Sequence, residues 1–164
     1  MIRIHHLGMS RSDRIVWLAQ DFNIPYEIIH PRRGEDFRSP PSLWAVHPMG
    51  KAPVIEHDGK TVFESGAIVE YLTDQFAEEF RPKKGTDEYL RYTHWMHCAE
   101  STLMTPILFG FIGGAMGVDS EALDGFVAGE LKTVLTYLND QLVEQNYVAG
   151  NDFTGADVMV AYPL

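Results

Sequence analysis

The chain of 164 residues is long enough for one ordinary domain or two small ones, and a hydrophobic content of 45% is typical of a globular protein with a core. Its net charge of −10 argues against nucleic-acid binding, because phosphates require a cationic surface. No apolar run approaches the length of a membrane span. Cys98 is the only cysteine, so no intrachain disulfide can form and a reducing, cytoplasmic setting is expected.

The charge is distributed unevenly along the chain. Residues 1–84 contain 11 Lys/Arg and 12 Asp/Glu, for a net charge of −1, whereas residues 85–164 contain 2 and 11, for a net charge of −9. The change falls at the linker-like sequence RPKKG, residues 81–85. It predicts a first domain over residues 1–80 and a second over residues 86–164.

The first 30 residues predict a strand, a helix and a second strand. Residues 2–7 form the first strand, residues 11–22 carry an apolar face at helical spacing, and residues 26–30 form the second strand. Ser10 and Asp13 match a capping box at the start of the helix. A right-handed crossover would make the two strands parallel.

The segment from residue 47 to residue 72 predicts a hairpin followed by a helix. Asp58-Gly59 between two β-rich runs is a strong hairpin signal. Pro53 lies just before the first strand of the hairpin, where a missing N–H is tolerated; a cis Ala52–Pro53 bond would expose the main chain of Ala52 to an extended ligand. Ser65 is placed as the N-cap of a helix ending near residue 76, and the N–H groups behind a Ser at that position can bind a carboxylate. The order β-α-β then β-β-α predicts a thioredoxin-like domain.

The second half predicts helices throughout. Thr86 begins a long helix that Pro106 should kink or end. Four glycines are expected to loosen the next stretch, and another helix covers about residues 120–143. The glycines are Gly110, Gly113, Gly114 and Gly117.

A second capping box is predicted near the end of the chain. Thr154 and Asp157 have the required spacing, and Phe153 and Val158 occupy the positions of a hydrophobic staple.

Four motifs occur in order: SRSDR at a strand-to-helix turn, Pro-x-Gly-Lys-Ala-Pro, Glu-Ser before a helix, and FTGAD. With them the chain resembles glutathione S-transferases over nearly all of its length, most of all fungal and bacterial members with a serine-type active site. The resemblance implies an α/β thioredoxin-like domain with a mixed four-stranded sheet, followed by an all-α domain. Because family members continue with further helices, it also implies that the helical domain is truncated here.

The resemblance implies where glutathione would bind. Pro53 matches the family's cis-proline, and the main chain of Ala52 would pair with the cysteinyl unit. Glu64 and Ser65 match the pair that holds the γ-glutamyl end, and Lys51 matches a position that faces the glycine carboxylate.

Two serines are candidates for the contact with the glutathione sulfur. Ser10 stands four residues before Arg14, as the active-site serine does in theta-like members, and Ser12 is its rival. A free thiol has a pKa near ~8.5, and a hydroxyl donor at a helix N-terminus favours the thiolate. Lowering the pKa by about 2 units requires roughly 3 kcal/mol. The alternative interpretation of Ser10 is helix capping alone.

The expected function is conjugation of glutathione to small hydrophobic electrophiles, with glutathione-dependent peroxidase activity as a further possibility and a homodimer as the implied assembly. The main alternative is a non-catalytic binding or interaction protein of the same fold. A thiol–disulfide oxidoreductase is disfavoured, because no cysteine lies near Ser10.

Several other residues invite a functional interpretation. His94, His97 and Glu100 share a helical face, but this spacing is more often found at surfaces, and no metal is expected. Glu100 is also a candidate for the amino group of glutathione, and Cys98 is expected to be a small core residue. Apolar side chains of the second half could line a pocket for the second substrate or simply pack between helices; they are Trp95, Met96, Met104, Leu108, Phe109, Phe111 and Met116.

Overall fold

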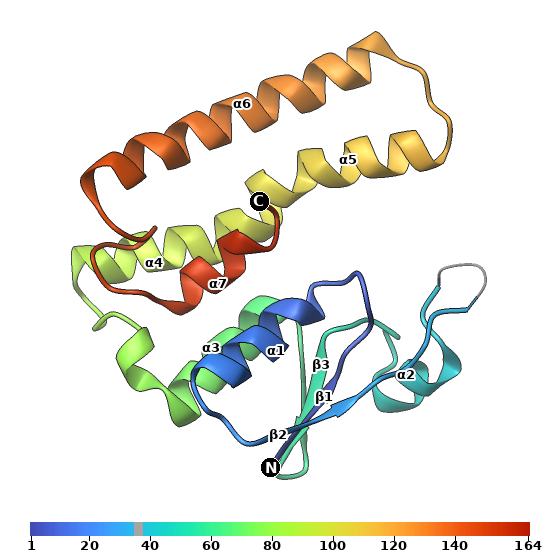
Figure 1. Ribbon diagram of the computed structural model, residues 1–164, viewed down its shortest axis with the longest axis vertical. Coiled ribbons are helices and arrows are strands. Elements are labelled where there is room, and N and C mark those ends of the chain that lie inside the picture. Colours follow the sequence, from blue (N-terminus) through green and yellow to red (C-terminus); the bar gives the residue numbers. More distant parts are fainter. Residues whose placement is uncertain (35–37) are drawn as a thin grey trace. The chain divides into compact units, whose positions relative to one another are not determined.

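The computed structural model describes residues 1–34 and 38–164 (Figure 1). The chain divides into two compact units, Met1–Arg81 and Pro82–Leu164. They are called the first and the second unit below, and each is described by itself.

The first unit is built on a mixed four-stranded sheet with the strand order β2-β1-β3-β4. β1 and β2 are parallel, whereas β1–β3 and β3–β4 are antiparallel, which confirms the predicted thioredoxin-like arrangement. The strands are β1 (Ile2–His5), β2 (Tyr26–Ile29), β3 (Val54–His57) and β4 (Lys60–Phe63); the helices are α1 (Ser12–Asp21), α2 (Pro41–Val46), α3 (Ser65–Phe76) and the short 3₁₀ helix η1 (Glu78–Phe80).

The core of the first unit lies between the sheet and the helices α1 and α3, which run side by side in Figure 1. Each helix contributes apolar residues at helical spacing, and β1 contributes the inward side of the sheet. Burial of each large aliphatic side chain stabilises the fold by about 1.5–3 kcal/mol. The fully buried members include Ile2, Ile4, Ile15, Leu18, Ile55, Ile68 and Leu72.

The predicted hairpin is present between β3 and β4. Asp58 and Gly59 both have positive φ, 48° and 75°. This is the backbone of the two-residue turn whose twist suits antiparallel strands.

Two predicted helix starts are wrong in detail. Arg11 is the N-cap of α1 and no side chain caps this helix; the Ser10 hydroxyl instead accepts a hydrogen bond from the Ser12 N–H at 3.2 Å. The N-cap of α3 is Glu64, with φ 68°, so Ser65 is the first helical residue and its side chain is free for a different role.

The second unit is helical throughout. Its elements are α4 (Asp87–Cys98), the π-helical turn η2 (Ala99–Leu103), α5 (Met104–Ala115), α6 (Glu121–Glu144) and α7 (Gly155–Ala161). Thr86 caps α4, and Ser120 caps α6. Thr154 and Asp157 form the predicted capping box of α7.

Pro106 does not end the helix, and the glycines act differently from the prediction. Pro106 lies in the first turn of α5, directly after the π-helical turn; a proline disturbs the helix around the residue four positions earlier, here Thr102 inside that turn, and the helix then continues. Gly110 and Gly113 lie inside α5, and the helix ends before Gly117, whose φ is 67°. Packing of α5 against α6 therefore outweighs the low helix propensity of glycine.

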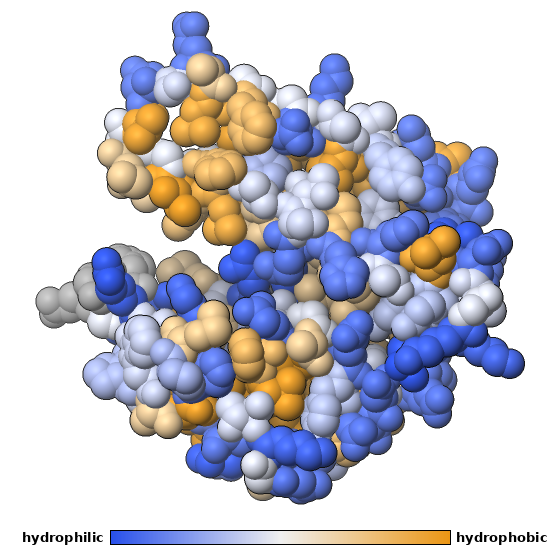
Figure 2. Space-filling model, turned by 180° about the vertical axis from the view of Figure 1, so that it is seen from behind, coloured by the Kyte–Doolittle hydropathy of each residue, from blue (hydrophilic) through white to orange (hydrophobic). Residues whose placement is uncertain are grey.

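The long helix Asp87–Ala115 corrects the expectation about apolar runs. By length and composition it would be able to cross a membrane, since its best window has a mean hydropathy of 1.2 and 28% of that window is buried. A single such helix is weak evidence, because core helices of soluble proteins meet the same criteria. Figure 2 shows apolar side chains gathered at the surface near the α5–α6 connection; the exposed ones include Phe109, Phe111, Ile112, Met116 and Phe126.

Candidate functional site at one edge of the sheet

The register of the sheet brings three chain segments to one edge. β1 pairs with β3 through His5 and Val54, and β3 pairs with β4 through Val54 and Phe63. The turn that follows β1, the peptide that precedes β3 and the helix that follows β4 therefore lie at the same edge (Figure 1). All of the residues predicted to bind glutathione belong to these three segments, except Glu100, which lies in the second unit.

The first segment contains both candidate serines, and their hydroxyl oxygens lie 2.7 Å apart. Ser12 is completely buried, whereas Ser10 is half-buried. The Ser12 oxygen accepts a hydrogen bond from Leu7 N–H at 3.1 Å and lies 3.1 Å from the Leu7 carbonyl, to which it can donate. Ser12 thus ties the start of α1 back to the end of β1, and Ser10 is the more accessible of the two.

His6 completes this cluster and was not among the residues predicted for the site. Its Nδ1 lies 2.8 Å from the Ser12 oxygen and 3.6 Å from Oδ1 of Asp13. Its ring meets the His30 ring edge to face, with centroids 4.7 Å apart. Burial lowers the pKa of His6 most strongly, Asp13 opposes this and His30 adds to it. His6 is therefore neutral at neutral pH.

Arg33 holds the turn that carries Ser10. Its Nε donates to the Gly8 carbonyl at 3.1 Å, and its Nη2 donates to the Met9 carbonyl at 3.0 Å. Met9 has a positive φ of 52°, so the guanidinium stabilises a backbone conformation that a non-glycine residue rarely adopts. Arg33 was not among the residues predicted for the site.

The second segment contains the cis Ala52–Pro53 peptide bond that the resemblance implied. Ala52 packs against the buried cluster of Leu7, Leu43 and Val54, while Lys51 is exposed.

Gly50 shapes the approach to this segment. It has a φ of 57°, and a Cβ at this position would overlap the indole of Trp44. A glycine is therefore needed here for both backbone and space.

The third segment is the start of α3, where Glu64 is exposed and Ser65 is buried. The Ser65 hydroxyl accepts a hydrogen bond of 2.9 Å from Nη1 of Arg14, which is 1% exposed. Arg14 connects the first turns of α1 and α3. A charged residue on the apolar face of α1 could have indicated that Arg14 connects the two helices, but Arg14 was considered only for its spacing from Ser10.

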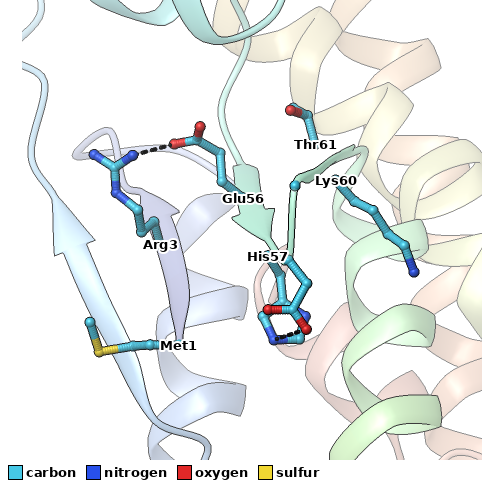
Figure 3. Close-up of a pocket in the computed structure, with 8 residues that line it drawn as sticks. Met1, Arg3, Glu56, His57, Lys60 and Thr61 are labelled. Atoms are coloured by element: carbon cyan, nitrogen blue, oxygen red, sulfur yellow. Dashed lines mark hydrogen bonds and ion pairs between the residues drawn. The ribbon is translucent and has the colours of Figure 1, made fainter.

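Two pockets are lined by other residues, one in each unit. One, of about 280 Å³, surrounds the β3–β4 turn at the opposite end of the strands (Figure 3); in it Arg3 pairs with Glu56 at 3.0 Å, and Nε2 of His57 lies 3.5 Å from Oδ2 of Asp58. The other, of about 260 Å³, lies between α4 and α6, beside Trp95 and Tyr137. Neither contains a residue predicted to bind glutathione.

The remaining candidates of the second unit separate by burial. Within residues 1–34 and 38–164, no group of three side chains could hold a metal ion, and His94 and His97 are exposed. Cys98 is half-buried, and burial raises the pKa of its thiol while a hydrogen bond with Thr102 opposes the shift, so little thiolate forms at neutral pH. Glu100 is half-buried.

The apolar candidates divide in the same way. Trp95, Met96 and Met104 are buried in the helical packing, whereas Phe109, Phe111 and Met116 are exposed and Leu108 is intermediate.

Comparison with known proteins decides the family. Residues 2–74 match the glutathione S-transferase N-terminal domain. The chain is 34% identical to glutathione S-transferase 3 of Schizosaccharomyces pombe over 100% of its own length and 73% of the relative. The chain belongs to the glutathione S-transferase family. A glutathione S-transferase from Actinobacillus pleuropneumoniae has the same fold, with a TM-score of 0.87 and 29% identity over 99% of this chain and 76% of the other.

Two further proteins are similar to the chain. A theta-class member from Xanthomonas axonopodis pv. citri, solved with glutathione bound, has a TM-score of 0.80 at 24% identity over 97% of this chain and 78% of the other, which shows the fold alone. A probable elongation factor 1-gamma of Arabidopsis thaliana is 30% identical over 76% of this chain and 30% of that protein.

Proposed function

We propose that this chain is a glutathione transferase that binds glutathione at the edge described above and uses Ser10 to stabilise its thiolate. The observation that carries the proposal is the half-buried Ser10 hydroxyl, presented next to the start of α1 by a turn that Arg33 and Ser12 hold in place. The site requires no metal ion in this reaction.

Binding is assigned to groups that suit a charged tripeptide. Ser65 accepts from the Arg14 cation and keeps its own hydroxyl proton for an anion, and the first turn of α3 presents N–H groups without intrahelical partners. These groups favour the γ-glutamyl carboxylate. Glu64 suits the amino group of the same unit, the main chain of Ala52 suits the cysteinyl unit, and Lys51 suits the glycine carboxylate.

In the proposed reaction the protein stabilises the thiolate of glutathione. The thiol releases its proton to solvent, and the Ser10 hydroxyl donates to the thiolate. With an aryl halide, the sulfur forms a bond to the ring carbon, the carbon–halogen bond breaks and the halide leaves with its electron pair. With a peroxide, the sulfur attacks one oxygen, the O–O bond breaks, an alcohol leaves after taking up a proton, and a second glutathione reduces the resulting sulfenic acid to give the disulfide and water. A charge-assisted hydrogen bond contributes about 1.5–3 kcal/mol, or about one to two units of thiol pKa. The guanidinium of Arg33, which binds the same turn, adds positive charge.

Ser10 is preferred to Ser12 on geometric grounds. The Ser12 oxygen is fully buried and already has four polar neighbours, which exceeds the one donor and two acceptor sites of a hydroxyl. It would have to break these contacts to reach a sulfur.

The second substrate, the assembly and the location follow the family resemblance. We assign a small hydrophobic electrophile as co-substrate, a homodimer as the assembly and a cytoplasmic location; glutathione peroxidase activity is the related reaction to assay beside conjugation.

The second candidate is a non-catalytic binding or interaction protein. The similarity to elongation factor 1-gamma favours it, since a chain of this kind occurs in a protein that is not named as a transferase. A thiol–disulfide oxidoreductase has no support at this edge, because the sole cysteine, Cys98, belongs to the second unit.

The deciding experiment measures glutathione binding by calorimetry and conjugation with a generic aryl halide for the wild type, Ser10→Ala, Ser12→Ala and the exposed-serine control Ser101→Ala. We expect Ser10→Ala to bind glutathione normally and to lose about 10-fold or more in turnover at neutral pH. Turnover that is the same in Ser10→Ala and the control would refute the serine mechanism, and binding without any turnover in the wild type would support the non-catalytic alternative.

A further inference from the structure

A chain of hydrogen bonds runs from His6 through Ser12 to Ser10 and influences which group receives the hydroxyl proton of Ser10. The three groups follow one another at 2.8 Å and 2.7 Å. Only Ser10, the last of the three, is accessible enough to meet a ligand, since Ser12 is fully buried.

The capacity of the Ser12 oxygen decides the arrangement of protons. A hydroxyl oxygen accepts two hydrogen bonds and donates one. The N–H of Leu7 occupies one acceptor position of Ser12. The second position can be taken by an N–H at Nδ1 of His6 or by the hydroxyl proton of Ser10, but not by both.

The tautomer of His6 therefore has two different outcomes. When Nδ1 carries the proton, both acceptor positions of Ser12 are filled, and Ser10 must direct its proton elsewhere. When Nδ1 lacks the proton, Ser12 donates to His6 or to the Leu7 carbonyl, and its second acceptor position is open to the Ser10 proton, which is then used inside the chain.

We propose that His6 is a positioning residue that, as the Nδ1–H tautomer, makes the Ser10 hydroxyl available as donor to the glutathione sulfur. The inference rests on the proposed function, because it requires a thiolate at Ser10. His6 touches neither substrate nor reacting atoms and acts through Ser12.

The charged and titratable groups around His6 fit this role. Asp13 on α1 lies 3.6 Å from Nδ1 and favours a proton there. His30, at the end of β2, contacts the ring by its edge, and burial keeps His6 neutral. Arg33 binds carbonyls of the adjacent turn. At neutral pH the His6 ring therefore carries a single proton, on either Nδ1 or Nε2, and Asp13 favours the tautomer with the proton on Nδ1.

The first test is direct and needs no substrate. Nitrogen-15 spectra of the histidine-labelled wild-type protein distinguish a protonated Nδ1 from a protonated Nε2. A proton on Nδ1 of His6 supports the inference, and the Nε2–H tautomer overturns it.

The second test uses three variants. His6→Leu removes the donor, His6→Asn keeps an N–H donor near the position of Nδ1, and His5→Asn alters the neighbouring histidine, which bonds Glu56 at 2.8 Å instead of Ser12. The pKa of bound glutathione is read from the ultraviolet absorbance of its thiolate and from the pH profile of kcat/KM.

We expect His6→Leu to raise the thiol pKa by about one unit and to lower activity below that pKa about tenfold, without changing glutathione affinity. His6→Asn should restore the wild-type profile, and His5→Asn should leave it unshifted. An unshifted profile in His6→Leu with full glutathione binding overturns the role of His6 alone. A wild type without glutathione binding or thiolate absorbance refutes the proposed function, and this role with it.

Discussion

Removal of the Asp157 carboxylate tests how far the end of the second unit depends on one side chain. Oδ1 accepts from Val148 N–H at 2.9 Å, and Oδ2 accepts from Thr154 N–H at 2.8 Å and from the Thr154 hydroxyl at 2.9 Å. Val148 and Thr154 are 4% and 3% exposed, so water cannot readily replace the lost acceptor. A buried donor left without a partner costs about 1–3 kcal/mol, and two such N–H groups are affected.

We therefore expect Asp157→Ala to lower the free energy of unfolding by about 3 kcal/mol. This is a large share of the 5–15 kcal/mol that is typical of whole proteins. Asp157→Asn keeps one acceptor oxygen and should lose about half as much. The measurement is urea denaturation followed by circular dichroism.

Asp152→Ala is the matched control, because Asp152 is an exposed carboxylate five residues earlier and should change stability by less than about 0.5 kcal/mol. If Asp157→Ala were destabilised no more than this control, the bridging carboxylate would not hold the loop to α7, and the reasoning from the three hydrogen bonds would be refuted.

Three further predictions concern the first unit. Arg14→Leu should weaken glutathione binding about tenfold or more in calorimetry, because the charge that acts through Ser65 is lost, and unchanged affinity would contradict this. Gly50→Ala should lower the free energy of unfolding by at least about 1 kcal/mol, since its φ of 57° disfavours alanine and the Cβ meets Trp44, whereas Gly59→Ala at the hairpin meets no neighbour; equal losses would refute the steric part. The pKa of His6 is lowered in the folded protein, so the unfolded chain binds a proton more readily. The contribution of His6 to the free energy of unfolding is therefore full above the unfolded pKa of 6.5 and declines as the pH falls through and below that value. Denaturation curves of His6→Asn should show a smaller loss of stability between neutral and acidic pH than the wild type, and an identical loss would argue against a buried neutral His6.

The fold could be predicted from local signals where these agreed with the packing. Asp58-Gly59 between β-rich runs specified the hairpin, and Thr154 with Asp157 specified the start of α7. The prediction failed where tertiary contacts determined the local structure. Ser10 has capping spacing to Asp13, yet the Ser12 hydroxyl folds back onto Leu7 and draws Ser10 with it. The spacing alone cannot reveal such a return to the preceding strand.

The residues of the candidate site that belong to a sequence motif were predicted, whereas the residues that hold them in place were not. His6, Arg33 and Arg14 act on the site through contacts with residues 6, 24 and 51 positions away, respectively. No local pattern contains such contacts. Two of them had a signal in the sequence, a polar residue beside apolar neighbours: Arg14 on the inward face of α1 and His6 at the end of a buried strand.

The same register that closes the sheet also fixes the site. Val54 pairs with His5 on one side and Phe63 on the other, and it is buried together with Ile55, while Glu56 lies beside Arg3 and His5. A slip of β3 by one residue would exchange the faces of these side chains and would move Glu56 away from Arg3 and His5, so the register is specified. Because Ala52 and Pro53 directly precede Val54, that preference holds the proposed glutathione-pairing peptide beside the turn of Ser10. The pairing of one short strand with its two neighbours thus determines where the backbone and the sulfur of the ligand would meet the protein.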